Sequence, residues 1–154
     1  MAYVLHPYGP AVRRLHLCGG RRVRMMVLVI DDTDSARDVA ERILRFYGVQ
    51  AVGAKSGSEA FSVLERVEPD LILLDIAMPE MDGLTLLERL KQDERWEGIP
   101  VVMMTAIADE ESVGRAFRLG ACEYLVKADF TAPRMLDVVR RHARSPSTPG
   151  GLPH

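Results

Sequence analysis

The chain has 154 residues, of which 47% are hydrophobic and 27% are charged, and its formal net charge is −2. This length suits one domain that buries a core without disulfides, and the charge gives no reason to expect nucleic-acid or membrane binding. The two cysteines, Cys18 and Cys122, form no CxxC or Cys/His cluster, which excludes a disulfide framework and a zinc site. The apolar run at residues 25–30 is too short for a signal peptide or a membrane span. A cytoplasmic location is expected.

Residues 1–25 differ in composition from the rest of the chain. They contain five arginines, several glycines and prolines, and no acidic residue. No helical or strand period runs through them, so the sequence predicts a disordered, solvated extension. Two alternatives stay open: a basic arm for an anionic partner, or a translation start at Met25 or Met26.

From Met26 onward, short apolar runs alternate with segments of helical spacing. The apolar runs predict strands over residues 27–30, 49–54, 71–74, 101–104 and 123–126. The helical spacing predicts helices over 35–47, from a Ser58 cap to Val67, across Leu84–Leu90, over 109–119, and after a Thr131 cap with Pro133 in the first turn. The turn-rich residues 144–154 are predicted to form a disordered tail.

This alternation predicts a single α/β domain over residues 26–143. Strands that alternate with helices form a parallel sheet with right-handed crossovers. Ligands of such sheets bind beyond the carboxyl ends of the strands.

Chemically distinctive residues follow four of the five predicted strands. Asp31 and Asp32 follow the first, Asp75 the third, Thr105 the fourth and Lys127 the fifth. Because the carboxyl ends of parallel strands share one edge of the sheet, these residues are expected to converge.

The residue types at this edge indicate phosphoryl chemistry with a metal. Two carboxylates ~4 Å apart repel by about 4 kcal/mol at an effective dielectric constant of about 20, so the cluster needs a cation or a proton. Hard carboxylate oxygens with few other ligands suit Mg²⁺, which also accepts phosphate oxygens. A carboxylate can itself accept a phosphoryl group, and a hydroxyl and an ammonium can stabilise the transferred charge.

Four motifs occur in a characteristic order: VLVIDD, LILLDIAMPEMDG, VVMMTA and EYLVK. On these motifs the chain, from about Met26 to His142, resembles the receiver domain of two-component response regulators. The resemblance implies a flavodoxin-like sheet of order 2-1-3-4-5 with helices on both faces. It also implies a phosphorylation switch that is loaded by a sensor histidine kinase or a phosphotransfer protein and depends on Mg²⁺.

The resemblance also implies roles for individual residues. Asp75 matches the phosphoacceptor, and Asp31 and Asp32 match the acidic pair that holds Mg²⁺ together with Asp75 and the backbone carbonyl of Ala77. Thr105 and Lys127 match the residues that contact the phosphoryl group, and Ala106 the small residue that leaves access to it. Tyr124 matches the aromatic residue that turns inward on activation.

Output is expected through protein–protein contact, on the face made by the fourth helix, the fifth strand and the fifth helix, which includes Tyr124. The short segment after Arg144 leaves no room for a DNA-binding module, so a stand-alone receiver with no direct DNA binding and no membrane contact is expected. Catalysis is expected only of its own phosphorylation and dephosphorylation. A homodimer is left open.

Two departures from the family pattern carry expectations. The family usually has a cis proline after the lysine, whereas Ala128 follows Lys127; because a cis bond before a non-proline residue costs about 2.5–4 kcal/mol, a trans bond is expected. Ala77 and Ile107 stand two residues beyond Asp75 and Thr105, where the family uses side chains that guide water. Slow self-dephosphorylation is therefore expected.

Two other functions compete with this interpretation. A Mg²⁺-dependent phosphohydrolase of the haloacid-dehalogenase type would place a second Asp two residues after the nucleophile, where this chain has Ala77. A degenerate receiver would act as an interaction or dimerisation module without phosphorylation. The intact acids, Thr105 and Lys127 argue against the degenerate module, and Ala128 argues for it.

Overall fold

In the computed structural model of the protein, the described residues are 16–18, 21–23, 25–106 and 109–144. Five parallel strands form the central sheet: β3 (Met26–Ile30), β4 (Gln50–Ala54), β5 (Leu71–Asp75), β6 (Val101–Thr105) and β7 (Glu123–Val126). Their spatial order is β4-β3-β5-β6-β7, which is the predicted order 2-1-3-4-5. Each predicted strand is present, with bounds that differ by at most one residue at either end.

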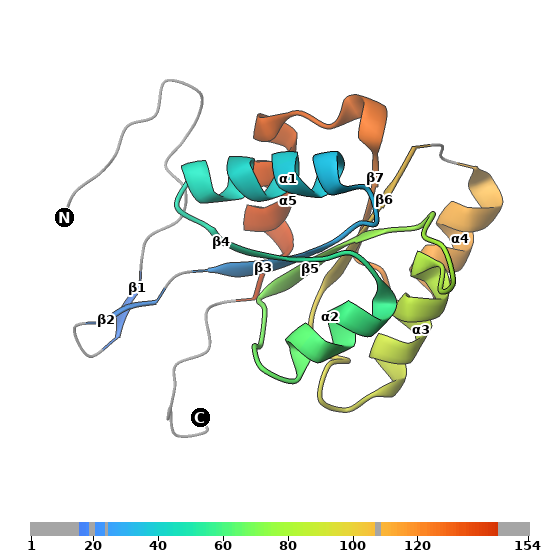
Figure 1. Ribbon diagram of the computed structural model, residues 1–154, viewed down its shortest axis with the longest axis horizontal. Helices are drawn as coiled ribbons and strands as arrows, with labels where there is room; N and C mark the ends of the chain where they lie inside the picture. The colour runs from blue at the N-terminus through green and yellow to red at the C-terminus, as the bar shows by residue number, and fades with distance from the viewer. Residues whose placement is uncertain (1–15, 19–20, 24, 107–108, 145–154) are drawn as a thin grey trace.

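Helices cover both faces of the sheet, as predicted (Figure 1). They are α1 (Asp34–Phe46), α2 (Gly57–Leu64), α3 (Gly83–Gln92), α4 (Glu110–Arg118) and α5 (Ala132–His142), with a 3-10 turn η1 (Lys127–Asp129) after β7. Figure 1 shows α1 and α5 on one face and α2 and α3 on the other, with α4 beside α3.

Side-chain alternation along the strands divides the core into two layers. In β3, Leu28 and Ile30 pack with α2, α3 and α4, whereas Val27 and Val29 pack with α1 and α5. Successive strand side chains point to opposite faces, so a strand covered on both sides is apolar throughout. This explains why the apolar run of β5 leads without interruption to Asp75, the first polar residue at the sheet edge.

Side-chain caps start four of the helices. Asp82, Asp109 and Thr131 accept hydrogen bonds from the backbone N–H three residues later, and Thr131 thus caps α5 as predicted. The prediction that Ser58 caps α2 is wrong, because Ser56 is the cap and accepts from the Glu59 N–H at 3.1 Å. Ser56 and Glu59 have the spacing of a capping box, which marks the earlier serine as the helix start.

Both ends of the domain differ from the predicted extensions. A two-stranded antiparallel ribbon, β1 (His16–Cys18) and β2 (Arg21–Val23), lies where no element was predicted. The Gly-Gly sequence between the two strands is a hairpin signal. The predicted disorder of residues 1–15 and 145–154 lies outside the described residues.

Arg144, which was predicted to begin the disordered tail, is attached to the domain. Its N–H donates to the Asp70 carbonyl oxygen at 3.0 Å, and its guanidinium pairs with Glu68 at 3.0 Å.

Among the helices that the structure describes, none has the length and apolar character needed to cross a membrane.

Candidate functional site

The carboxyl edge of the sheet gathers three carboxylates. Asp31 and Asp32 follow β3 and Asp75 ends β5, its central neighbour. One oxygen from each of the three groups lies within 4.8 Å of the others. Asp31 is 1% exposed and Asp75 3% exposed, while Asp32 lies further out. The predicted acidic cluster is therefore present as a geometric arrangement.

Local hydrogen bonds hold Asp31 in place. Its N–H donates to the Ala54 carbonyl oxygen of β4 at 3.1 Å, which extends the sheet by one bond. Its carboxylate oxygen Oδ1 accepts from the Thr33 N–H at 2.9 Å. The second oxygen, Oδ2, accepts from the Lys127 ammonium at 2.7 Å. Both carboxylate oxygens of Asp31 thus have a fixed direction.

Asp75 is buried in an unfavourable electrostatic position. Burial, together with the nearby charge of Asp31, raises the pKa of Asp75 to about 6, although Lys127 and the Ala77 N–H act in the opposite direction. A carboxylate with this pKa is mostly ionised at neutral pH. Its charge is nevertheless poorly compensated. A cation that binds beside such a charge gains the most favourable electrostatic energy.

Lys127 supplies the one ammonium seen among these acids in the described part of the chain. Its Nζ lies 2.7 Å from Asp31 Oδ2 and 3.5 Å from Asp75 Oδ1. Although burial opposes the charge of Lys127, its ion pairs with Asp31 and Asp75 raise its pKa. No cis peptide bond occurs among the described residues, so the expected trans bond between Lys127 and Ala128 is confirmed, and the chain continues into the turn η1.

The remaining residues predicted for the site lie at the end of β6, directly after it, or on the neighbouring strand β7. Thr105 ends β6, which separates the strands that deliver Asp75 and Lys127, and it is 6% exposed. Ala106 after it is exposed. Burial raises the pKa of the Tyr124 phenol, while its interaction with the Thr105 hydroxyl lowers it. Ile107 lies outside the described residues.

The loop after Asp75 needs glycine at its far end. A Cβ on Gly83 would lie 2.1 Å from the Asp75 carbonyl oxygen, so only glycine lets the start of α3 approach the end of β5 so closely. The Gly83 N–H donates to the Ile76 carbonyl oxygen at 2.8 Å and closes this loop. Within the loop, Glu80 has a φ of 67°, a conformation that is uncommon for a residue with a side chain.

Sequence reasoning missed one residue at this edge, Arg37 of α1. Its Nη1 donates to the backbone carbonyl oxygen of Asp31 at 2.7 Å. In the sequence, Arg37 lies three residues after Asp34 and four before Glu41, a spacing typical of solvated ion pairs on a helix. The acids that precede it at the strand end were the only sequence signal that this arginine would lie near the cluster.

The donor set fits a hard divalent cation. Three carboxylates face one ammonium, so the described groups leave an excess of two negative charges. Burial, and after it the charge of Asp31, raises the pKa of Asp75, so its carboxylate is also poorly compensated. Mg²⁺ would balance the excess negative charge, held by carboxylate oxygens of Asp31, Asp32 and Asp75. The backbone carbonyl of Ala77 stays a predicted further ligand.

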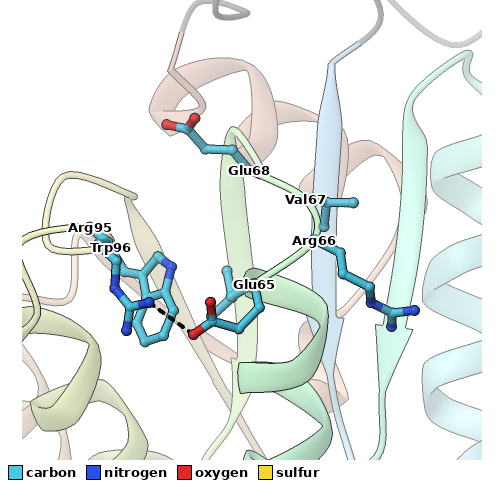
Figure 2. Close-up of a pocket in the computed structure, with 7 residues that line it drawn as sticks. Glu65, Arg66, Val67, Glu68, Arg95 and Trp96 are labelled. Carbon is cyan, nitrogen blue, oxygen red and sulfur yellow. Dashed lines mark hydrogen bonds and ion pairs between the residues drawn. The ribbon is translucent and has the colours of Figure 1, made fainter.

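A hollow of about 330 Å³ lies away from this edge, at the ends of α2 and α3 (Figure 2). It is lined by residues 64–68 together with Arg95 and Trp96. Arg95 stacks on Trp96, with its guanidinium carbon 4.1 Å from the ring centroid, and pairs with Glu65 at 2.9 Å. Glu68 pairs with Arg144. These charges satisfy one another, so the hollow does not compete with the acidic edge as the site of chemistry.

Comparison with known sequences agrees with the site geometry. A family model described as the response regulator receiver domain matches residues 27–140. A 14.6 kDa protein of Leptolyngbya boryana is 39% identical over 104 residues, which are 68% of this chain and 79% of that protein. The DNA-binding dual master transcriptional regulator RpaA of Synechocystis is 36% identical over 114 residues, 74% of this chain. The match spans only 47% of RpaA.

Comparison with solved structures gives the same fold. The chemotaxis protein CheY4 of Vibrio cholerae superposes with a TM-score of 0.73 at 26% sequence identity. The match covers 77% of this chain and 98% of CheY4.

Proposed function

This chain belongs to the response regulator receiver domain family, and we propose that it is a phosphorylation-dependent switch whose phosphoacceptor is Asp75. The receiver domain occupies residues 26–143 in this proposal. The phosphoryl donor is the phosphohistidine of a sensor kinase or of a phosphotransfer protein. As a signalling protein, it would catalyse only its own phosphorylation and dephosphorylation.

The observation that carries this proposal is the position of Lys127. Its ammonium lies between Asp31 and Asp75, at 2.7 and 3.5 Å, although the family's proline is absent. A degenerate receiver would not need to retain a buried acid pair together with its counter-ion. Burying charges costs free energy unless they are paired, so the retained cluster favours a functional role.

The carboxylate oxygen of Asp75 would attack the phosphorus atom of the donor. As the new O–P bond forms, the P–N bond to the donor imidazole breaks, and the imidazole leaves with the electron pair and takes a proton from solvent. Bound at the three carboxylates, Mg²⁺ would neutralise charge on the phosphoryl oxygens. The product is an acyl phosphate on Asp75.

Two side chains of the pocket would then hold the phosphoryl group. The Lys127 ammonium is already 3.5 Å from Asp75 and needs only a small movement to pair with the new oxygens. The Thr105 hydroxyl, at the end of β6, would donate to another of these oxygens. An added charge of about −1.5 to −2 is enough to bias a loop between two arrangements.

Thr105 also offers a route from the site to the surface. Thr105 pairs with Val126 of β7, the strand that carries Tyr124, so a hydroxyl drawn toward a phosphoryl group would change the surroundings of the tyrosine. We place the output on the face formed by α4, β7 and α5. Of these elements, α4 carries Phe117, which is 49% exposed. The partner would be a protein, and it could be a second copy of this chain.

Acetyl phosphate, a small phosphoryl donor, tests this function without a known kinase. The full chain is incubated with acetyl phosphate and Mg²⁺ and then separated by phosphate-affinity electrophoresis beside Asp75→Asn. The parent is expected to shift and the variant to stay unshifted. A parent that does not shift supports the degenerate module, and a shift that persists in Asp75→Asn overturns the choice of phosphoacceptor.

A further inference from the structure

Arg37 bonds the peptide that joins the two adjacent acids of the cluster. The carbonyl oxygen of Asp31, which accepts from Arg37 Nη1 at 2.7 Å, belongs to the peptide between Asp31 and Asp32. The orientation of this peptide determines where the Asp32 side chain starts relative to that of Asp31. A bond to its carbonyl oxygen therefore acts on both carboxylates together.

The guanidinium of Arg37 is itself held by two acids of the same helix. Its Nη2 donates to Asp34 Oδ1 at 2.5 Å, and its Nε lies 4.0 Å from Glu41 Oε1. Glu41 is in turn paired with Arg45, whose Nη2 lies 2.9 Å from Glu41 Oε2. Only 18% of the Arg37 side chain and 15% of the Glu41 side chain are exposed. These two residues are therefore buried much more deeply than an ordinary surface pair on a helix.

Gly53 of β4 makes room for this arrangement. A Cβ at Gly53 would lie 2.0 Å from Glu41 Oε1 and 3.0 Å from Arg37 Cδ. The first contact is far closer than non-bonded atoms allow and the second is tight, so a side chain here would displace the glutamate carboxylate and press against the arginine stem. The absent side chain of Gly53 thus seats Glu41 and Arg37 against the strand that neighbours β3.

We propose that Arg37, seated on Gly53 and Glu41, is a positioning residue that orients the Asp31–Asp32 peptide and thereby sets the affinity of the acidic cluster for Mg²⁺. This inference rests on the proposed function. Residues that orient metal ligands commonly change metal affinity by about 10- to 100-fold when they are removed. Arg37 does so through a backbone carbonyl and touches neither the metal nor the phosphoryl group.

The sign of the effect separates positioning from simple charge. Arg37 carries a positive charge near the acids, so its removal would strengthen Mg²⁺ binding if charge alone mattered. Loss of orientation acts in the opposite direction and weakens binding. Gly53→Ala distinguishes positioning from charge in a second way, because it keeps every charge and displaces only the side chains of Glu41 and Arg37.

The experiment measures Mg²⁺ binding to the full chain by isothermal titration calorimetry, without a phosphoryl donor. Arg37→Gln is expected to raise the Mg²⁺ dissociation constant about tenfold, at the lower end of the range for such residues. Gly53→Ala is expected to raise it in the same direction by a smaller factor. The matched control is Arg42→Gln, which removes the same charge from α1 at a site where Arg42 pairs with the exposed Asp38.

A second measurement follows phosphorylation by acetyl phosphate as Mg²⁺ is raised. The half-saturating Mg²⁺ concentration is expected to rise for Arg37→Gln, and added Mg²⁺ is expected to recover much of the lost rate. If Arg37 only stabilised the fold, its removal would lower the free energy of unfolding and leave this concentration unchanged.

Each outcome decides between the two proposals. If the parent binds Mg²⁺ and Arg37→Gln binds it as tightly or more tightly, the positioning inference fails and the proposed function stands. If the parent binds no Mg²⁺, both fail. If Arg37→Gln does not fold, Gly53→Ala decides, and an affinity equal to that of the parent overturns the inference.

Discussion

The Lys127 ammonium lies 2.7 Å from Asp31 Oδ2 and joins the end of β7 to the end of β3 across 96 residues of sequence. The same ammonium is 3.5 Å from Asp75. It therefore neutralises part of the acidic cluster and lies close to the carboxylate proposed to accept the phosphoryl group.

Removal of Lys127 should make Asp75 harder to ionise. Lys127→Met takes away the main group that lowers the pKa of Asp75, which is about 6 with the lysine present. The pKa is expected to rise by about 1 pH unit, as measured by NMR titration of the labelled carboxyl carbon in the absence of Mg²⁺. Lys55→Met, at an exposed lysine after β4, is the control. An unchanged pKa in Lys127→Met would show that the ion pair does not form in solution.

Asp75→Asn should stabilise the fold at neutral pH. The pKa of Asp75 in the folded protein, about 6, exceeds the ordinary value of 3.8, so the folded state binds the proton more tightly than the unfolded state. Stability from this group is therefore lost as pH rises from about 4 to about 6, and it stays lost above that. In EDTA near pH 7 the variant is expected to be about 1–2 kcal/mol more stable, and near pH 4 equal to the parent.

Urea unfolding at several pH values measures this difference. Asp32→Asn is the comparison, because Asp32 lies further out than Asp75 and its charge is better solvated. If Asp75→Asn were less stable than the parent at neutral pH, the Asp75 carboxylate of the parent would have to be well compensated without a metal.

Gly83→Ala should damage the site through the fold. The added Cβ would lie 2.1 Å from the Asp75 carbonyl oxygen, which is backbone and cannot turn aside, so α3 must move away from β5. A loss of about 1–3 kcal/mol of unfolding free energy is expected, together with slower phosphorylation.

Gly114→Ala is the matched control for that change. Gly114 lies inside α4, and its Cβ would approach only the flexible end of Arg118, at 3.2 Å. Alanine in a helix is favoured over glycine by about 0.8–1 kcal/mol, so this variant should be slightly more stable than the parent. Equal losses in the two variants would contradict the role assigned to Gly83.

The acyl phosphate should be lost slowly. Ala77 is exposed beside Asp75 and offers no polar group to guide water toward the phosphorus. A half-life of minutes or longer is expected after removal of the donor, and a half-life of seconds would contradict this. Ala77→Asn, which supplies a polar side chain at this position, is expected to shorten the half-life by about tenfold or more. The decay is followed by phosphate-affinity electrophoresis.

Several parts of the fold and site follow from the sequence because strong local patterns encode them. Strands buried on both faces must be apolar along their length, so the runs before Asp31 and Asp75 mark both the strands and their ends. Parallel topology then brings these ends together. The trans bond after Lys127 follows from Ala128, because only proline makes the cis form inexpensive.

The missed features depend on neighbours that no local pattern identifies. Ser56 and Ser58 are both acceptable helix caps by residue type, and only the spacing to Glu59 separates them. Arg37 has the spacing of a surface ion pair, and its half-buried position depends on the missing side chain of Gly53 on β4. Long-range packing of this kind is set by the tertiary fold.

The central claim is that Asp75 accepts the phosphoryl group, and chemical mapping of the acyl phosphate tests it most directly. The full chain is treated with acetyl phosphate and Mg²⁺, reduced with borohydride, digested and sequenced by mass spectrometry. Borohydride reduces an acyl phosphate on aspartate to homoserine, which marks the modified position permanently. We predict homoserine at position 75 and unmodified aspartates at Asp31 and Asp32. Homoserine at Asp31 or Asp32, or at no position, would contradict the account.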